Sequence, residues 1–188
     1  MRLLLHTCCG PCASGCTPRL KAEGDGVVLF FSNSNIDTSE EFDRRLAAAR
    51  RLAEADGLDI VVDEYDHADW LEKVACGFES EPEKGARCAR CFRYSLSRAA
   101  AYASRNGFDA FSTSLTVSPH KVSAMVFAAG EDATWTESAK ECGGSASSAS
   151  RFLPIDFKKS DGFLLSLRRS AELGLFRQTY CGCEFSRR

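Results

Sequence analysis

The sequence predicts an α/β protein, a single domain with a Rossmann-like, open, mostly parallel sheet and helices on both faces. Short apolar runs alternate with segments whose apolar residues recur at helical spacing, and this alternation is typical of parallel sheets. The 188 residues are enough to bury a core without cross-links. No internal repeat or long linker divides them, so we expect one domain over residues 1–188.

The first half of the chain predicts three strands, each followed by helical sequence. The strands are expected at residues 2–8 (RLLLHTC), at 26–36 (GVVLFFSNSNI), which ends in a polar loop, and at 58–66 (LDIVVDEYD). Gly10-Pro11 opens the first helix, because proline suits the first helical turn. A capping-box pattern at residues 38–41 (TSEE) predicts a long helix that ends near residue 57.

The second half continues the alternation. Helical sequence is predicted at residues 68–75 and from about 87 to 105, followed by a strand at 110–118 (AFSTSLTVS). Ser118-Pro119 is expected to start another helix. After a small-residue loop at 142–150 come a predicted fifth strand at 151–157 (RFLPIDF) and a last helix at 163–174.

The chain contains ten cysteines, and their role depends on whether the protein is secreted or cytoplasmic. The apolar stretch at residues 3–5 is too short for a secretory signal, and no stretch approaches the ~18 apolar residues of a membrane span. We therefore expect a cytoplasmic protein without a membrane partner. In that compartment, clustered cysteines more often bind metal or take part in catalysis than form structural disulfides.

The charge is distributed unevenly. The formal net charge is −2, yet residues 84–108 contain six Lys and Arg and no acidic residue, and residues 151–188 carry a local +4. Local basic patches rather than whole-chain charge are what nucleic-acid binding requires. A solvated helix face with a soluble tail explains the same pattern, so both interpretations stay open at this point.

Seven cysteines fall into three clusters. These are Cys8, Cys9 and Cys12 after the first strand, Cys88 and Cys91 at a helix start, and Cys181 and Cys183 near the end of the chain. Helix N-termini stabilise thiolates, and open α/β sheets bind ligands beyond the carboxyl ends of their strands. Cys16, Cys76 and Cys142 are instead expected to be small packing residues.

Two kinds of metal compete for these thiols. Two C-x-x-C pairs can form a four-thiolate structural zinc site. An iron–sulfur cluster also takes four thiolates, and it gives the remaining cysteines a partner for electron exchange. The surplus of cysteines favours iron and sulfide, since a domain of this size does not need zinc to fold.

Six motifs in order resemble the epoxyqueuosine reductase family that does not use cobalamin. They are HTCCGPC, FSNSNIDTSEEFDRR, RCARCF, FSTSLTVSPHK, IDFKKSDGF and LFRQTYCGC, and together they span nearly the whole chain. The resemblance implies a single catalytic domain, an oxidoreductase that reduces epoxyqueuosine to queuosine at the wobble position of tRNA. This reaction is the last step of queuosine biosynthesis, so tRNA would be a partner, together with an electron donor that the sequence does not identify.

The resemblance also assigns the thiols. It implies that a 4Fe-4S cluster is held by Cys8, Cys9, Cys88 and Cys91. It implies that Cys181 and Cys183 are a redox-active pair that cycles through a disulfide. A second mononuclear iron is allowed in the family, where some members have aspartate at the position of Cys12, which makes Cys12 a further catalytic candidate.

Other candidate site residues follow from position. His6 precedes the cluster cysteines and could donate a proton, although a histidine at a strand end is more often structural. Asn33, Asn35 and Asp37 follow the second strand and could bind the modified base. Arg98 and Arg105 lie in the basic run and are expected to meet tRNA phosphates.

Two further functional classes stay open. A tRNA-thiolating enzyme should carry an SGGxDS-type ATP loop after the first strand, where this chain has HTCCGPC. A zinc-stabilised tRNA-binding module without catalysis would leave Cys181 and Cys183 without a role.

Overall fold

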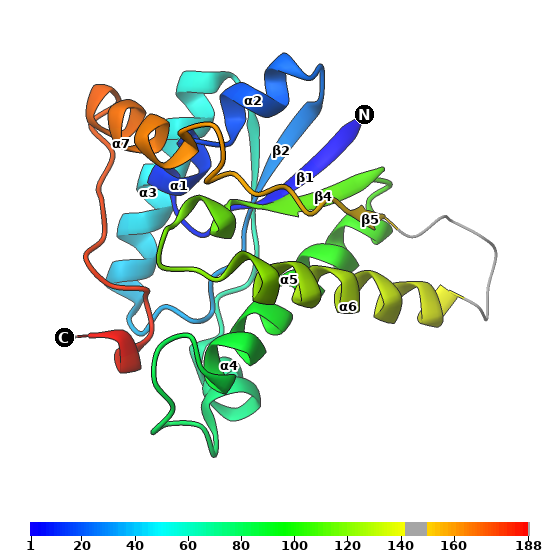
Figure 1. The fold of residues 1–188 in the computed structure, drawn as a ribbon, viewed down its shortest axis with the longest axis vertical. Helices are drawn as coiled ribbons and strands as arrows, with labels where there is room; N and C mark the ends of the chain where they lie inside the picture. Colours follow the sequence, from blue (N-terminus) through cyan, green and yellow to red (C-terminus); the bar gives the residue numbers. More distant parts are fainter. Residues whose placement is uncertain (142–149, 188) are drawn as a thin grey trace.

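Five parallel strands form one sheet at the centre of the molecule (Figure 1). The computed structural model describes residues 1–141 and 150–187. The strands are β1 (Arg2–His6), β2 (Gly26–Phe31), β3 (Asp59–Val62), β4 (Ala110–Thr113) and β5 (Arg151–Phe152). Their order, β3-β2-β1-β4-β5, places β1 in the middle. This arrangement confirms the predicted α/β class.

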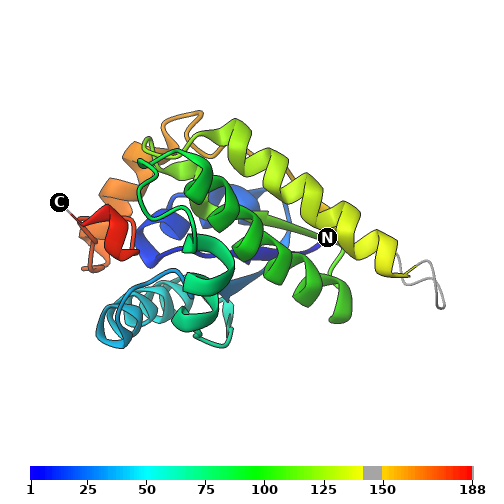
Figure 2. The ribbon, with the colours of Figure 1, turned by 90° about the horizontal axis from the view of Figure 1, so that it is seen from below.

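Helices cover both faces of the sheet. They are α1 (Gly10–Ser14), α2 (Thr17–Ala22), α3 (Ser39–Asp56), α4 (His67–Trp70), α5 (Ala86–Arg105), α6 (Ser123–Glu141) and α7 (Gly162–Glu172). Shorter turns are the π-helix η1 (Leu71–Ala75) and the 3-10 helices η2 (Ser114–Val117) and η3 (Glu184–Ser186). Figure 2 shows α3 on one side of the sheet and the pair α5 and α6 on the other.

Alternation along β1 explains the two layers. Leu3 and Leu5 point into a core shared with α1, α2 and α3, whereas Leu4 points into a core shared with α5 and α6. Successive side chains of a strand point to opposite faces, so a strand buried on both faces is apolar throughout. All three leucines are fully buried.

Local signals fix the helix positions. The Thr38 hydroxyl accepts a hydrogen bond from Glu41 N at 3.2 Å, which caps α3 as predicted. Gly57 ends α3 with φ 64°, a left-handed conformation that glycine adopts without strain. A Cβ at Gly10 would lie 2.6 Å from the Ala48 carbonyl oxygen, so glycine is required where α1 contacts α3.

Several predicted boundaries differ from the structure, among them β3, which ends at Val62 and not at residue 66. The chain leaves β4 at Thr113, whose hydroxyl accepts from Leu115 N and turns the chain into η2. Ser118-Pro119 does not begin a helix, and α6 starts at Ser123 instead. The fifth strand ends at Phe152, since Pro154 cannot donate to a sheet ladder. The predicted loop at 142–150 lies outside the described residues except for Ser150.

The strand order fixes where a ligand site is expected. The chain passes from β1 to one side of the sheet and later to β4 on the other side. In open α/β sheets, such a reversal leaves a crevice at the carboxyl ends of the two strands. None of the helices in residues 1–141 and 150–187 is long and apolar enough to cross a membrane.

Candidate thiol and metal site

The first cysteine cluster lies at the carboxyl end of β1. Cys8 and Cys9 follow soon after His6, and α1 begins at the next residue. Ser114, immediately after β4, accepts from Cys8 N at 3.1 Å and donates to Cys8 Sγ at 3.3 Å. The cluster therefore lies at the crevice between the two strands where the sheet order reverses.

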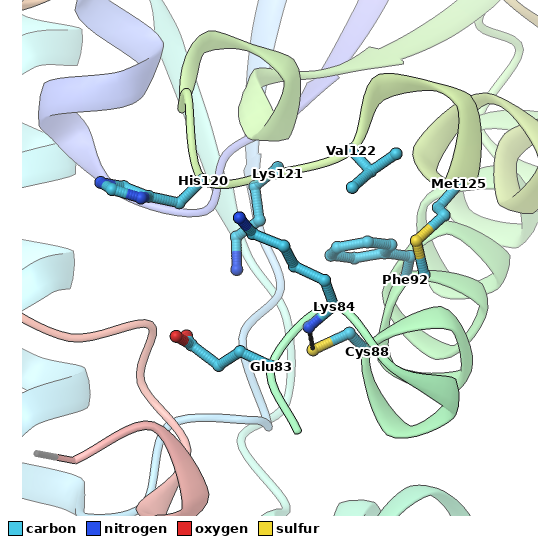
Figure 3. Close-up of a pocket in the computed structure, with 8 residues that line it drawn as sticks. All are labelled: Glu83, Lys84, Cys88, Phe92, His120, Lys121, Val122 and Met125. Carbon is cyan, nitrogen blue, oxygen red and sulfur yellow. Dashed lines mark hydrogen bonds between the residues drawn. The ribbon is translucent and has the colours of Figure 1, made fainter. Parts of the chain in front are cut away.

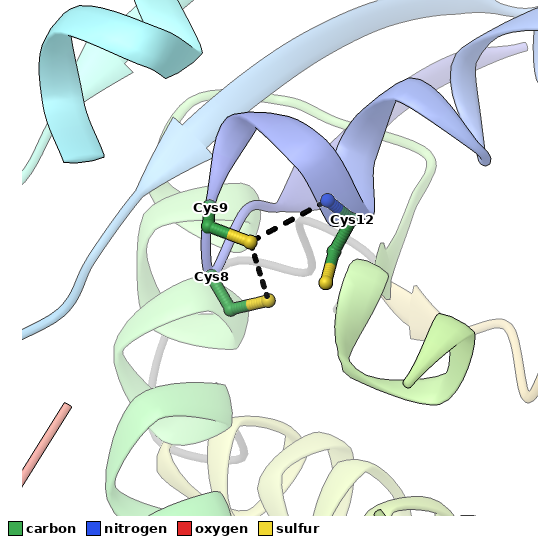
Figure 4. Close-up of side chains that lie close together, drawn as sticks. All are labelled: Cys8, Cys9 and Cys12. Atoms are coloured by element: carbon green, nitrogen blue, oxygen red, sulfur yellow. Dashed lines mark hydrogen bonds between the residues drawn. The ribbon is translucent and has the colours of Figure 1, made fainter. Parts of the chain in front are cut away.

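Three sulfurs of this cluster are close together (Figure 4). The Sγ atoms of Cys8, Cys9 and Cys12 all lie within 4.8 Å of one another, and Cys9 is completely buried. Cys9 is the N-cap residue of α1, and its Sγ accepts from Cys12 N at 3.4 Å. The chain is thus folded so that three thiols face one small space.

The three thiols differ in their pKa values. Hydrogen bonds from the thiols of Cys12 and Cys8 hold the pKa of Cys9 well below its ordinary value, against the effect of burial. The neighbouring Cys8 and Cys9 sulfurs, together with burial, raise the pKa of Cys12. One sulfur is therefore ready to carry negative charge, and a bound cation would remove the remaining protons.

Lys121 lies close to cysteines of both other clusters. Lys121 Nζ donates to Cys181 Sγ at 2.6 Å. Cys183 and Cys91 pack in one small cluster with Trp70. Burial raises the pKa of Cys91 to about 12.

Cys88 lies on the rim of the same region. It lines a pocket with Lys84, Phe92 and Lys121, and Lys84 N donates to its sulfur at 3.3 Å (Figure 3). Cys88 and Cys8 both pack against the buried core cluster that contains Leu4 and Phe92.

The predicted ligand quartet is only partly assembled. Cys8 and Cys9 lie together as expected, but the third member of the compact group is Cys12. Cys88 and Cys91 are not in that group. Within the described part of the chain, it is the only group of three or more metal-ligating side chains at such distances. Cys181 and Cys183 are both free thiols, so the expected disulfide is not formed.

The C-terminal segment is held against the cysteines by buried polar contacts. Arg45, 2 % exposed, donates to the Cys181 carbonyl at 2.9 Å and pairs with Glu41 at 2.7 Å. Gly182 O accepts from Asp37 N at 3.0 Å. Gly182 has φ 132°, and a Cβ there would lie 3.0 Å from Asn35 Nδ2. Glycine is therefore required between the two thiols.

Several predicted substrate-binding residues have intramolecular partners. Asn33 is buried and donates to the Thr7 carbonyl at 2.9 Å. Asp37 accepts from Tyr180 Oη at 2.8 Å and pairs with Arg187 at 2.6 Å. Asn33 therefore holds the residue after β1, whereas Asp37, with Asn35 beside Gly182, contacts the C-terminal segment.

His6 fits the structural alternative. Its Nε2 lies 3.1 Å from Ser32 O and its Nδ1 2.9 Å from Thr113 Oγ1. Burial lowers its pKa to about 4. The neutral ring is therefore satisfied on both nitrogens, with neither directed at the crevice.

The two predicted arginines differ in their surroundings. Arg98 pairs with Asp63 at 2.6 Å and donates to Tyr94 Oη at 3.4 Å, and Tyr94 packs against the small cluster that contains Cys183 and Cys91. Arg105 ends α5, about 25 Å along the helix axis from Cys88.

Among the packing cysteines, Cys16 is fully buried as expected, but Cys76 is exposed because it follows η1 at the start of a turn. Cys142 lies outside the described residues.

Three residues of the site were not predicted. Lys121 and Gln178 contact Cys181 and Cys9, respectively, and Arg45 holds the tail. Lys121 and Gln178 lie inside the quoted motifs FSTSLTVSPHK and LFRQTYCGC. Their sequence signal was present, but a lysine or glutamine in a loop gives no indication of its partner.

Comparison with known proteins gives the family. A sequence model described as Epoxyqueuosine reductase QueH matches residues 3–188. The chain belongs to the epoxyqueuosine reductase QueH family. The QueH protein of Acinetobacter baylyi is 35 % identical over 190 residues, which cover 100 % of this chain and 81 % of the relative. The QueH of Streptococcus pyogenes serotype M1 is 32 % identical, covering 98 % and 69 %. The resemblance is therefore confirmed, and this member of the QueH family is an oxidoreductase.

A solved structure confirms the fold. The U34-tRNA thiolase NcsA from Methanococcus maripaludis, solved with its [4Fe-4S] cluster, superposes with a TM-score of 0.54. The match covers 95 % of this QueH-family chain and 58 % of the thiolase at 11 % identity. At that identity the similarity concerns the α/β architecture alone.

Proposed function

We propose that this chain reduces epoxyqueuosine to queuosine at the wobble position of tRNA, in the last step of queuosine biosynthesis. Family membership supports the reaction. The observation that carries the proposal is the set of contacts that link the C-terminal segment to the other two cysteine clusters. Gln178 joins the tail to Cys9, and Lys121 contacts Cys181 within reach of the pocket that Cys88 lines.

The thiols fit an iron–sulfur cluster. Three sulfurs within 4.8 Å, one of them favouring its thiolate, form the kind of donor set that iron and sulfide require. Cys8 and Cys9 are common to both candidate ligand sets. Cys12 is added by geometry, and Cys88 and Cys91 by the family resemblance. A second mononuclear iron would use Cys12 if the other four thiols hold the cluster.

The reaction consumes as many electrons and protons as the oxidation of one dithiol releases. Removing the epoxide oxygen as water leaves an alkene and consumes two electrons and two protons. Oxidation of Cys181 and Cys183 to a disulfide releases two electrons and two protons, and an external electron donor then restores the thiols. When bound, an iron–sulfur cluster supplies electrons singly.

The first test is metal content and turnover after anaerobic purification. We expect iron and sulfide, a brown protein, and conversion of epoxyqueuosine-containing tRNA to the queuosine form. Cys9→Ala should lose the iron, whereas Cys76→Ala, at an exposed position, is the matched control and should keep it.

The same preparations test the alternatives. Stoichiometric zinc without iron would contradict the proposal and favour a non-catalytic tRNA-binding module. Formation of a thiolated nucleotide would favour a thiolating enzyme. In Cys183→Ser, we expect iron to remain while multiple turnover is lost, because one member of the dithiol is missing.

A further inference from the structure

Gln178 joins the C-terminal segment directly to the compact thiol group. Its Nε2 donates to Cys9 Sγ at 2.9 Å, across 169 positions of sequence. Its Oε1 is buried and has no hydrogen-bond partner within the described residues. A half-satisfied amide is unusual in a protein interior, so its orientation toward Cys9 needs an explanation beyond packing.

The Cys9 sulfur receives two N–H donors. Besides Gln178 Nε2, Cys12 N donates to it at 3.4 Å. Donors that converge on one buried sulfur stabilise negative charge there, as expected for a sulfur that binds metal. Of these two donors, only Gln178 can be removed by substitution without changing the backbone of α1.

We infer that Gln178 is a positioning residue that hydrogen-bonds a metal-bound Cys9 sulfur and raises the reduction potential of the iron centre held there. This inference rests on the proposed function. Reduction adds negative charge to a cluster and its sulfurs, so a donor to one sulfur favours the reduced state. The same contact keeps the tail, with Cys181 three residues later, against that centre.

The test is a potentiometric titration of the anaerobically purified full chain, followed by electron paramagnetic resonance. Gln178→Leu removes the donor and leaves an apolar side chain that is one atom shorter than glutamine. It should keep iron, sulfide and melting temperature near wild type, while the equilibrium constant for reduction falls about tenfold. That factor corresponds to about 59 mV for one electron and to about 1.4 kcal/mol, within the range of ~0.5–1.5 kcal/mol for a typical hydrogen bond.

Two further variants make the result decisive. Thr179→Val, at the exposed neighbouring position, is the matched control and should not change the potential. Gln178→Glu replaces the donor by a carboxylate and should lower the potential at least as much. If Gln178→Leu loses its iron, the reduction potential of Gln178→Glu tests the inference instead.

An unchanged potential in an iron-loaded Leu or Glu variant would overturn this inference and leave the proposed function standing. Wild-type protein without iron would overturn both. The two failures are therefore distinguishable, and the readout does not depend on turnover.

Discussion

At the scale of single residues, Lys121 gives the thiols of Cys181 and Cys183 different surroundings. Its ammonium lies 2.6 Å from Cys181 Sγ and 5.6 Å from the centre of the Phe92 ring. Burial disfavours the charge, but the nearby Cys181 sulfur outweighs it and holds the pKa of Lys121 above its usual value. Cys183 is buried at 8 % exposure, whereas Cys181 is partly exposed. Cys181 is therefore the thiol placed to react first.

Replacing Lys121 by Met tests this difference. The substitution keeps most of the length of the side chain and removes its charge, so negative charge on the Cys181 sulfur loses its partner. Alkylation of Cys181 by iodoacetamide, followed by mass spectrometry, should slow about tenfold, the factor for a charge-assisted contact of about 1.4 kcal/mol. Lys159→Met, at an exposed lysine, should not change the rate. Equal rates in both variants would show that Lys121 does not distinguish the thiols.

At the scale of elements, Asp56 at the end of α3 connects three helices. Its Oδ1 pairs with Arg169 of α7 at 2.6 Å, and its Oδ2 accepts from Thr17 of α2 at 2.6 Å. Burial raises the pKa of Asp56, but hydrogen bonds from Arg169 and Thr17 outweigh burial and bring the pKa below its usual value. These contacts join α2, α3 and α7 on the face of the sheet that also carries α1.

Asp56→Asn should lower the free energy of unfolding by about 2 kcal/mol at neutral pH, since the charged hydrogen bonds are lost. Because the folded-state pKa lies below the unfolded one, the unfolded state binds more protons as pH falls below about 4. The wild type therefore loses this contribution there, and the difference between the two proteins shrinks. Urea unfolding at pH 6 and pH 3 measures this difference in the free energy of unfolding. Asp59→Asn, at an exposed position, is the control. A difference that does not change with pH would contradict the ion pair.

At the scale of the whole molecule, the basic run of the sequence is divided between two regions. Lys84 is exposed beside Cys88 on the pocket rim (Figure 3). Arg105 lies at the far end of α5, where its Nε donates to the Ala101 carbonyl. A tRNA whose wobble base reaches the thiols would pass Lys84 before it could reach Arg105.

We therefore expect Lys84→Gln to weaken binding of an anticodon stem-loop more than Arg105→Gln does. Each lost phosphate contact should reduce the slope of log affinity against log salt by about 1. Fluorescence anisotropy at several salt concentrations measures both variants. Arg98 and Arg105 as phosphate contacts stay a prediction, and a larger loss in Arg105→Gln would favour it over Lys84.

The sequence alone determined the α/β class, the cysteine clusters and the family, because these are local in origin. Strand and helix periods follow from consecutive residues, and the cap of α3 joins Thr38 to Glu41 nearby in the sequence. The motifs were sufficient to relate the chain to its relatives without knowledge of a single contact. Boundaries failed where a side chain redirected the backbone, as Thr113 does after β4.

Only the tertiary structure decided which groups meet. Gln178 reaches Cys9, Lys121 reaches Cys181, and Asp37 binds the tail, each across many residues of chain. Arg105 lies away from the site although it belongs to the same helix as Cys88, since a rigid helix separates residues in proportion to their spacing. Such partners depend on how β1, β4 and the C-terminal segment converge in space, and no local pattern encodes that convergence.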